Sequence, residues 1–293
     1  MIVVQTLIAA LSLGSLYAVL ALGLALVASI MRLVNFAHGE LIMGAAYAMA
    51  FSFAFGPAAM IAAALVVGVV LALASDQIGF RALRSADSTT LFISSFAISF
   101  LLQNTASALF GSTSRTVPAL PALSQPITIG EISFPMLDIV IIATAAVLLG
   151  GLTLLLKKTR TGLRMRAAAE DFRVARTLGV RANRVIALGF GLSGLFAAFA
   201  AVIVVAQSGV VSPTMGSDLV LIAFIACVLG GLGSLPGAVV GGFVLGVLTV
   251  VLQAYLPVEL KYYRDAFAFG AVIILLVWRP QGLLPSATAG TRV

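Results

Sequence analysis

Residues 157–184 read KKTRTGLRMRAAAEDFRVARTLGVRANR and form the one long polar stretch in an otherwise apolar chain. Nine of the seventeen Lys and Arg residues lie here, against two acidic residues, so the segment carries a net charge of +7. The nine are Lys157, Lys158, Arg160, Arg164, Arg166, Arg173, Arg176, Arg181 and Arg184. Short loops rich in Lys and Arg are retained on the cytoplasmic side of a membrane. The segment therefore predicts a cytoplasmic loop that fixes the orientation of its neighbours.

Within this loop, residues 163–178 are predicted to form one helix of 16 residues, roughly 24 Å long. Gly179 is placed to end it as the residue after the C-cap. Small or apolar residues recur on one face of this helix: Ala168, Phe172, Ala175 and Leu178. Small side chains permit close approach by another protein, which favours a docking helix. A solvated basic loop that only enforces topology fits the composition equally well.

The composition excludes a soluble protein. Hydrophobic residues make up 61% and charged residues 9% of the 293 residues, so polar groups could not cover the surface of a water-soluble domain. We therefore expect one all-α, polytopic membrane domain over residues 1–293. The isoelectric point near 10.2 is explained by basic loops, and no nucleic-acid module is visible. The single cysteine, Cys227, excludes an intrachain disulfide and a C-x-x-C metal or redox site.

Apolar runs predict about nine transmembrane helices, with eight to ten consistent with the pattern. The runs are residues 2–31, 35–55, 58–74, 89–110, 136–156, 185–207, 217–232, 237–256 and 263–278. The distribution of Lys and Arg then places the N-terminus outside and the C-terminus inside. The first run lacks the basic leader of a secretory signal and is interpreted as a retained span. It must tilt, bend or break, and the second run either spans or re-enters.

Two further connectors fit this topology. Residues 76–87 carry two arginines and are predicted to be cytoplasmic. Residues 111–135 contain four prolines and one basic residue, and are predicted to form the longest outward loop. Within them, residues 127–134 alternate between apolar and polar about Gly130 and Glu131, which predicts a β-hairpin. This loop is a candidate contact for a partner outside the membrane, with a plain spacer as the alternative.

Several polar side chains fall in or beside the apolar runs, where burial in lipid is costly. They are Tyr17, Asn35, His38, Glu40, Gln103 and Asn104. One interpretation is a path for a zwitterionic substrate, which needs a few hydrogen bonds in apolar surroundings. The other is structural. In that case Asn35 caps a helix, His38 bonds a backbone carbonyl, and Glu40 pairs with Arg32 or another basic residue.

Four segments together resemble one family. They are LSLGSLYAVLALGLALVASIMRLVNFAHGELIMGAAYAMA, TGLRMRAAAEDFRVARTLGV, GGLGSLPGAVVGG and WRPQGLL. The chain is similar along almost its whole length to the permease subunit of the branched-chain (hydrophobic) amino acid ABC importers. That resemblance implies a bacterial inner-membrane subunit that pairs with a second homologous permease. It also implies two ATPase subunits, which use ATP and Mg, and a periplasmic substrate-binding protein.

The resemblance also assigns a role to the basic loop. In such importers this loop carries an E-A-A motif and a downstream glycine that dock on the ATPase, and residues 168–170 with Gly179 are a loose version of it. We expect a coupling helix inserted in a groove of the ATPase. The residues expected to be buried there are Ala168, Phe172 and Ala175. Those expected at the rim are Arg164, Glu170 and Asp171.

The function expected is import of branched-chain or other hydrophobic amino acids. The chain has no G-x-x-x-x-G-K-[ST] phosphate loop, so energy must come from partners and no cofactor is expected on the chain itself. A catalytic pair or metal cluster with recognisable spacing is absent from the sequence, so we expect no enzyme. The alternative is a secondary transporter or channel for small polar solutes such as urea or amides. That class would place ionisable residues deep in the spans, whereas His38, Glu40 and Asp218 lie near predicted span ends.

Overall fold

The computed structural model describes residues 2–284 except 32, 85, 119, 121, 122, 124, 130, 131 and 171. Its helices are α1 (Ile2–Met31), α2 (His38–Ser52), α3 (Pro57–Ala74), α4 (Ser88–Phe110), α5 (Met136–Lys158), α6 (Arg160–Glu170), α7 (Phe172–Thr177), α8 (Ala182–Ser208), α9 (Met215–Gly230), α10 (Leu235–Tyr255) and α11 (Arg264–Trp278). Its strands are β1 (Arg115–Thr116), β2 (Pro126–Ile129), β3 (Ile132–Pro135) and β4 (Val210–Val211). A π-helical turn (Ser75–Phe80) continues α3.

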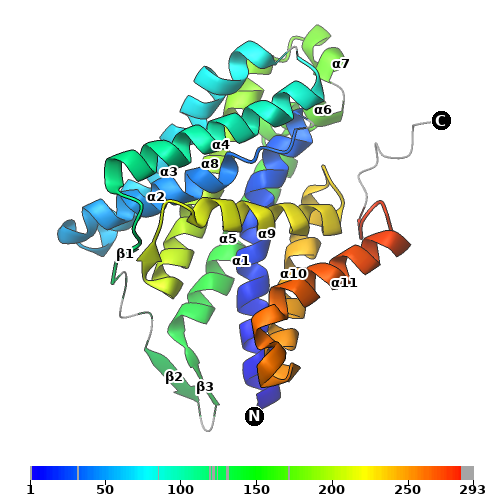
Figure 1. Ribbon diagram of the computed structural model, residues 1–293. Coiled ribbons are helices and arrows are strands. Elements are labelled where there is room, and N and C mark those ends of the chain that lie inside the picture. Colours follow the sequence, from blue (N-terminus) through cyan, green and yellow to red (C-terminus); the bar gives the residue numbers. More distant parts are fainter. Residues whose placement is uncertain are drawn as a thin grey trace.

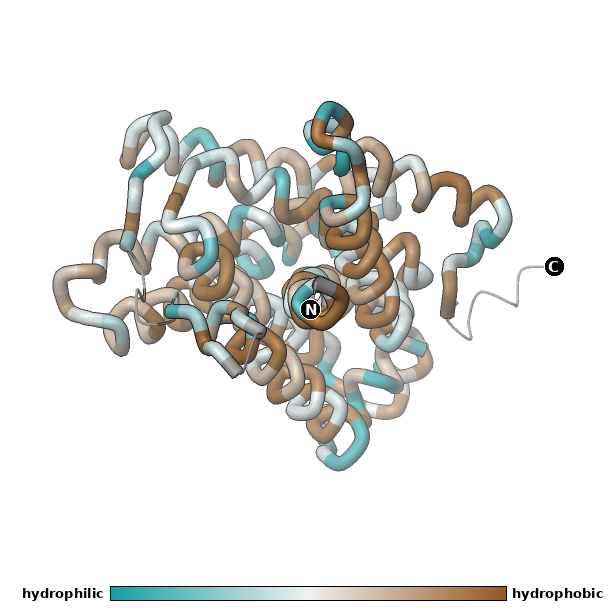
Figure 2. Tube along the Cα trace, turned by 90° about the horizontal axis from the view of Figure 1, so that it is seen from below, coloured by the Kyte–Doolittle hydropathy of each residue, from teal (hydrophilic) through white to brown (hydrophobic). Residues whose placement is uncertain are grey.

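α1 runs through the middle of the molecule, with other helices packed around it (Figure 1). Its sequence is apolar on every side, and such a helix is stable where its whole circumference is covered. Val19, Leu20 and Ala21 are fully enclosed by the protein. Seen along its axis, α1 occupies the centre of the bundle (Figure 2). α1 is an unbroken helix of 30 residues, so the alternative of a break is wrong.

α10 packs against α1 through small residues on both helices. A β-carbon on Gly242 would lie 2.5 Å from the backbone nitrogen of Ala18, and one on Gly246 would overlap the backbone of Gly14. The spacing of four residues on each helix brings the two backbones together over one turn, as in small-xxx-small contacts between membrane helices. The long apolar helix α1 is therefore fixed in place by close backbone packing.

Replacing Gly246 by alanine is expected to lower the thermal unfolding temperature, because the added methyl group must push α10 away from α1. Overpacking of this kind costs typically about 1–3 kcal/mol. Gly150→Ala in α5 is the matched control, because a β-carbon there meets open space and alanine favours a helix more than glycine does. Thermal unfolding of both purified variants, followed by intrinsic fluorescence, checks this. Equal unfolding temperatures would contradict close packing at Gly246.

Six helices in the described part of the chain are long and apolar enough to cross a membrane. They are α1, α3 with the turns that follow it, α4, α5, α8 and α10. Every predicted run coincides with a helix, which confirms a mostly helical membrane protein. However, α2, α9 and α11 have only 15, 16 and 15 residues, or about 22–24 Å, against a hydrocarbon core of about 30 Å. Helix length alone thus supports six crossings.

The outward and basic loops lie at opposite ends of the bundle. The N-terminus and the β2–β3 hairpin lie at the lower end in Figure 1, and α6 and α7 lie at the upper end. The Gln5 side chain donates a hydrogen bond to the backbone oxygen of Ser133, 3.0 Å away, which joins α1 to the hairpin. This separation agrees with a topology in which α5 carries the chain from one side of a membrane to the other.

The hairpin predicted within the outward loop is confirmed. β2 pairs antiparallel with β3, with Ile127 opposite Phe134, while the predicted turn residues 130 and 131 lie outside the described residues. A second, unpredicted strand pair joins β1 to β4. The loop is therefore attached to the connection between α8 and α9.

Asp87 begins α4. Its carboxylate accepts hydrogen bonds from the backbone nitrogens of Thr89 and Thr90, at 3.0 and 3.3 Å, and from the Thr90 hydroxyl at 2.6 Å. The hydroxyl and these backbone groups favour the charged form and hold the pKa of the Asp87 carboxyl below its usual value. Capping satisfies backbone donors that the first helical turn leaves free. The Asp87 side chain therefore fixes the residue at which α4 starts.

Candidate functional site

His38 lies in the core at the first turn of α2, where α1, α2 and α8 meet. Its Nδ1 is 3.0 Å from the Ser193 hydroxyl, and that hydroxyl donates to the Gly23 carbonyl at 2.7 Å. A hydroxyl has one proton to donate, so Ser193 accepts the second bond and His38 Nδ1 carries the proton. Nε2 is then a buried acceptor with no partner among the described residues.

Gly23 on α1 makes room for the His38 ring. A β-carbon there would lie 2.5 and 2.6 Å from two ring atoms, Cε1 and Nε2. His38 therefore bonds the Ser193 hydroxyl and not the backbone carbonyl that was predicted. The Ser193 hydroxyl in turn donates to the Gly23 carbonyl. Sequence reasoning did not identify Ser193, because a serine 155 residues away from His38 has no local signal linking the two.

Glu40 is fully buried and joins α2 to α4 and α9. The Ser99 hydroxyl donates to Glu40 Oε1 at 3.1 Å, and Ser217 of α9 lies close to the carboxyl group. Gln103 donates to the Ser217 hydroxyl at 3.3 Å. Glu40 Oε2 has no partner among the described residues. We call Glu40, Ser99, Gln103 and Ser217 the polar cluster.

The alternative partner predicted for Glu40 was a basic residue. Arg32 lies outside the described residues, and the hydrogen bond seen to Glu40 in the described chain comes from the hydroxyl of Ser99. A hydroxyl stabilises a carboxylate less than a cation does, and the second oxygen remains unpartnered. The cluster therefore keeps one buried hydrogen-bond acceptor without a partner among the described residues of α2, α4 and α9.

Glycines at Gly39 and Gly216 bring α2 and α9 into backbone contact beside the cluster. A β-carbon on Gly39 would overlap the backbone of Gly216, and one on Gly216 would lie 2.8 Å from Glu40 Oε2. Larger residues would therefore separate the two helices or displace the carboxyl group. Gly39 is next to His38 in the sequence, but the sequence does not show that Gly216 faces Gly39.

Three other predicted path residues lie apart from the cluster. Asn35 Oδ1 accepts from the backbone nitrogen of Ala37 at 3.1 Å, so Asn35 forms a turn before α2, and the helix N-cap is Ala37. Asn104 is exposed and donates to the Phe100 carbonyl of its own helix at 2.7 Å. Tyr17 lies on the side of α1 that packs against α10, near Thr249. Of the predicted set, the cluster thus unites Glu40 and Gln103.

The first helix of the basic loop, α6, begins at Arg160, three residues before the predicted start of the helix at residue 163. Helical structure is described over α6 and α7, and residue 171 between them lies outside the described residues. Gly179 ends α7 as predicted, with φ of 81°. The Gly179 nitrogen bonds the Arg176 carbonyl and the Val180 nitrogen bonds the Ala175 carbonyl, each at 3.1 Å. This is the Schellman arrangement, in which glycine adopts the left-handed conformation at low cost.

The predicted buried face of the coupling helix requires a correction. Ala168 and Ala175 are 3% and 2% exposed and pack into the core of this same chain, so they are not available to a partner in this structure. The Phe172 side chain and Asp171 lie outside what the structure describes. Periodicity identified an apolar face correctly, but it does not show which protein covers that face.

A different set of side chains is exposed on the loop. Leu163, Val174 and Leu178 are apolar and at least half exposed, and Arg164 and Glu170 are exposed beside them in α6. Val174 and Leu178 are four residues apart, so they lie on the same side of the helix. We call Val174 and Leu178 the exposed apolar pair.

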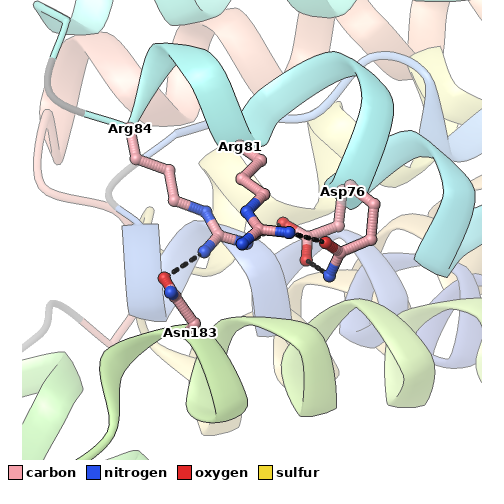
Figure 3. Close-up of polar contacts among 5 residues, drawn as sticks. Asp76, Arg81, Arg84 and Asn183 are labelled. Carbon is pink, nitrogen blue, oxygen red and sulfur yellow. Dashed lines mark hydrogen bonds and ion pairs between the residues drawn. The ribbon is translucent and has the colours of Figure 1, made fainter.

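Arg84 joins the connector after α3 to the start of α8 (Figure 3). Its guanidinium forms an ion pair with the buried Asp76 and also donates to the Asn183 side chain. Arg81 donates to Gln77 on the same side of the molecule. Asn183 lies in the first turn of α8, whose N-cap residue is Arg181. Both connectors predicted to be cytoplasmic thus meet at one end of the bundle.

A bundle of long apolar helices with a basic loop at one end is typical of a multi-pass membrane protein. Comparison with known proteins agrees. Residues 6–277 match the family described as the permease component of the branched-chain amino acid transport system. The chain belongs to this family, and it is a multi-pass protein of the bacterial inner membrane.

Two of the similar proteins align over nearly the whole chain, and a third aligns over about half of it. The high-affinity branched-chain amino acid transport system permease protein BraD of Pseudomonas aeruginosa is 34% identical, over 96% of this chain and 95% of BraD. The corresponding protein LivH of Escherichia coli K12 is 34% identical, over 93% of this chain and 92% of LivH. An autoinducer 2 import system permease protein, LsrC of Klebsiella pneumoniae, is 35% identical over 53% of this chain and 44% of LsrC.

Proposed function

We propose that this chain is the permease subunit of an ATP-driven importer for branched-chain or other hydrophobic amino acids. The observation that carries the proposal is the family match over residues 6–277, together with relatives named for branched-chain amino acid transport that align over more than nine-tenths of the chain. The helical bundle supplies a membrane passage, whereas ATP and Mg are used by partner subunits.

The partners follow from the same proposal. A second homologous permease completes the passage, two ATPase subunits bind at the basic loop, and a periplasmic protein delivers substrate. In this arrangement nine helices enter the membrane, with the N-terminus outside and the C-terminus inside. The charge of the loop at residues 157–184 supports this orientation. The short helices α2, α9 and α11 would cross only part of the bilayer and rely on packing against longer neighbours.

The substrate path is proposed to pass the polar cluster. The unpartnered Glu40 Oε2 can accept a hydrogen bond from the ammonium group of a zwitterionic amino acid. On α4, Gln103, Asn104 and Thr105 have exposed polar groups, which are costly in contact with lipid. A second permease facing α4 would cover this surface and place the passage between the two subunits. His38, by contrast, is buried where α1, α2 and α8 meet and bonds Ser193, and we propose that it positions α2.

The proposal is tested by reconstitution. The chain, a homologous permease, the two ATPases and the binding protein are placed in proteoliposomes, and uptake of radiolabelled leucine, isoleucine, valine and urea is measured with ATP inside. We expect ATP-dependent uptake of the hydrophobic amino acids that requires the binding protein. Uptake by this chain alone, driven by a proton gradient or by a concentration gradient of urea, would identify a secondary transporter or channel instead.

The β2–β3 hairpin is proposed to help receive the binding protein. It lies at the end of the bundle opposite the basic loop and is attached to α1 through Gln5. Deleting residues 127–134 is expected to weaken association of the binding protein by at least about tenfold, as loss of a contact worth about 1.4 kcal/mol would do. Surface plasmon resonance on the nanodisc complex measures this. Gln5→Ala is the control, because it releases the attachment and retains the hairpin. Unchanged affinity after the deletion rules the contact out.

A further inference from the structure

A pocket of about 460 Å³ lies between the basic loop and the first turns of α8. Its lining residues are Thr161, Arg164, Gly179, Arg181, Arg184, Val185 and Leu188. This volume is within the range of small-molecule sites in proteins, roughly 300–1,000 Å³. The pocket is separate from the polar cluster, which lies among α2, α4 and α9.

The lining of the pocket is positively charged. Three of its lining residues are arginines and none is acidic, and the ion pairs of Arg84 with Asp76 and of Arg264 with Asp265 involve none of these three arginines. The N-terminus of α8 adds partial positive charge, since no side chain caps it. Asn183, which would compete for these backbone groups, instead accepts a hydrogen bond from Arg84 (Figure 3). These features together favour a bound anion.

One side of the pocket is apolar and belongs to a candidate membrane span. That span begins at Asn183, so Val185 and Leu188 occupy its first turns. Leu188 is 45% exposed and lies within the pocket lining. Arginines that line the same pocket as an exposed apolar side chain of a candidate membrane span match a molecule with an anionic head and a hydrocarbon tail. An acidic side chain of a soluble partner would not need this apolar side.

We propose that this pocket binds the phosphate headgroup of an anionic phospholipid, with Arg164, Arg181 and Arg184 around the phosphate and an acyl chain along Leu188. The site is distinct from the transport path and from the exposed apolar pair. Arginine is well suited to this role because its planar guanidinium donates two parallel hydrogen bonds to phosphate oxygens. A lipid held here would connect the basic loop to α8, which crosses the bundle.

The test uses the reconstituted complex in nanodiscs of phosphatidylcholine containing increasing phosphatidylglycerol. Lipid retained after mild detergent extraction is counted by native mass spectrometry. Arg164→Gln with Arg184→Gln is expected to weaken phosphatidylglycerol binding about 25-fold, since each basic residue at a membrane surface contributes about fivefold. Arg166→Gln with Arg176→Gln is the matched control. It removes the same charge from exposed positions of the same loop that do not line the pocket, and binding is expected to be unchanged.

Two further arms separate the sources of the anion and guard against misfolding. Arg164→Lys with Arg184→Lys keeps the charge and is expected to retain most of the binding. Inorganic phosphate at millimolar concentration is expected to compete poorly, because it lacks an acyl chain. Phosphate binding as tight as that of the lipid would assign the pocket to free phosphate and overturn the proposal. Equal lipid loss in the pocket and control variants would overturn it too, as would loss of ATPase association with lipid binding intact.

Discussion

Replacing Leu178 by glutamate is expected to abolish substrate-stimulated ATP hydrolysis while leaving the permease folded. The Leu178 side chain is 77% exposed and next to the glycine that ends α7, so the fold does not depend on it. If the exposed apolar pair is the surface that binds the ATPase, a carboxylate there must be desolvated without a partner. A disruptive substitution at the centre of a binding surface typically costs at least about 2 kcal/mol of binding free energy, or about thirtyfold in affinity.

The measurement is ATP hydrolysis by the reconstituted complex with and without loaded binding protein, alongside the amount of ATPase that co-purifies. Leu178→Met keeps the apolar surface and is expected to couple normally. Leu232→Glu provides a second control, because Leu232 is also an exposed apolar residue but lies in the turn between α9 and α10. If the Leu178→Glu variant still shows substrate-stimulated ATP hydrolysis, the basic loop serves only to fix the orientation of the protein in the membrane. Ala175→Trp is unsuitable for this purpose, since Ala175 is in the core of the chain.

Glu40→Gln is expected to reduce amino acid uptake at least about tenfold without reducing assembly of the complex. Glutamine retains an oxygen to accept the Ser99 hydrogen bond, so the connection between α2 and α4 persists. It replaces the unpartnered acceptor Oε2 by an amide that donates, and an ammonium group can no longer bind there. A loss of about 1.4 kcal/mol of interaction during passage accounts for tenfold. Initial uptake rates, normalised to assembled complex, give the result.

Two variants separate a path from a structural network. Ser94→Ala serves as the control on α4, because the Ser94 hydroxyl donates to the Thr90 carbonyl of its own helix at 2.7 Å, and uptake is expected to be close to wild type. His38→Ala should instead lower the unfolding temperature, since it leaves the Ser193 hydroxyl without its donor and opens a cavity beside Gly23. If the Glu40→Gln loss simply follows the amount of assembled complex for every substrate, the cluster is structural and the proposed path is wrong.

The sequence predicted features that depend on neighbours in the chain. Gly179 could be placed because a left-handed C-terminal residue is almost always glycine. The hairpin could be placed because alternation of side chains has a period of two. Each apolar run also corresponds to a helix, since lipid requires backbone hydrogen bonds to be satisfied within a segment.

Features that depend on distant contacts were not predictable in this way. Lipid and protein interior are equally apolar, so the sequence of α1 does not show that the protein itself encloses it. The face containing Ala168 and Ala175 was recognised, but its partner proved to be this chain. The bonds from His38 to Ser193 and from Gln103 to Ser217 join residues 155 and 114 positions apart, and no local spacing relates them.

The enclosure of α1 constrains the order in which the protein is made. This helix leaves the ribosome well before α8, α9 and α10, which cover it. At about 5–20 residues per second, roughly 220 further residues take about 11 to 44 s to synthesise. During that interval α1 must be surrounded by lipid or by an insertion factor. A largely apolar surface allows both stages, because its side chains can exchange contacts with lipid for contacts with protein at little cost.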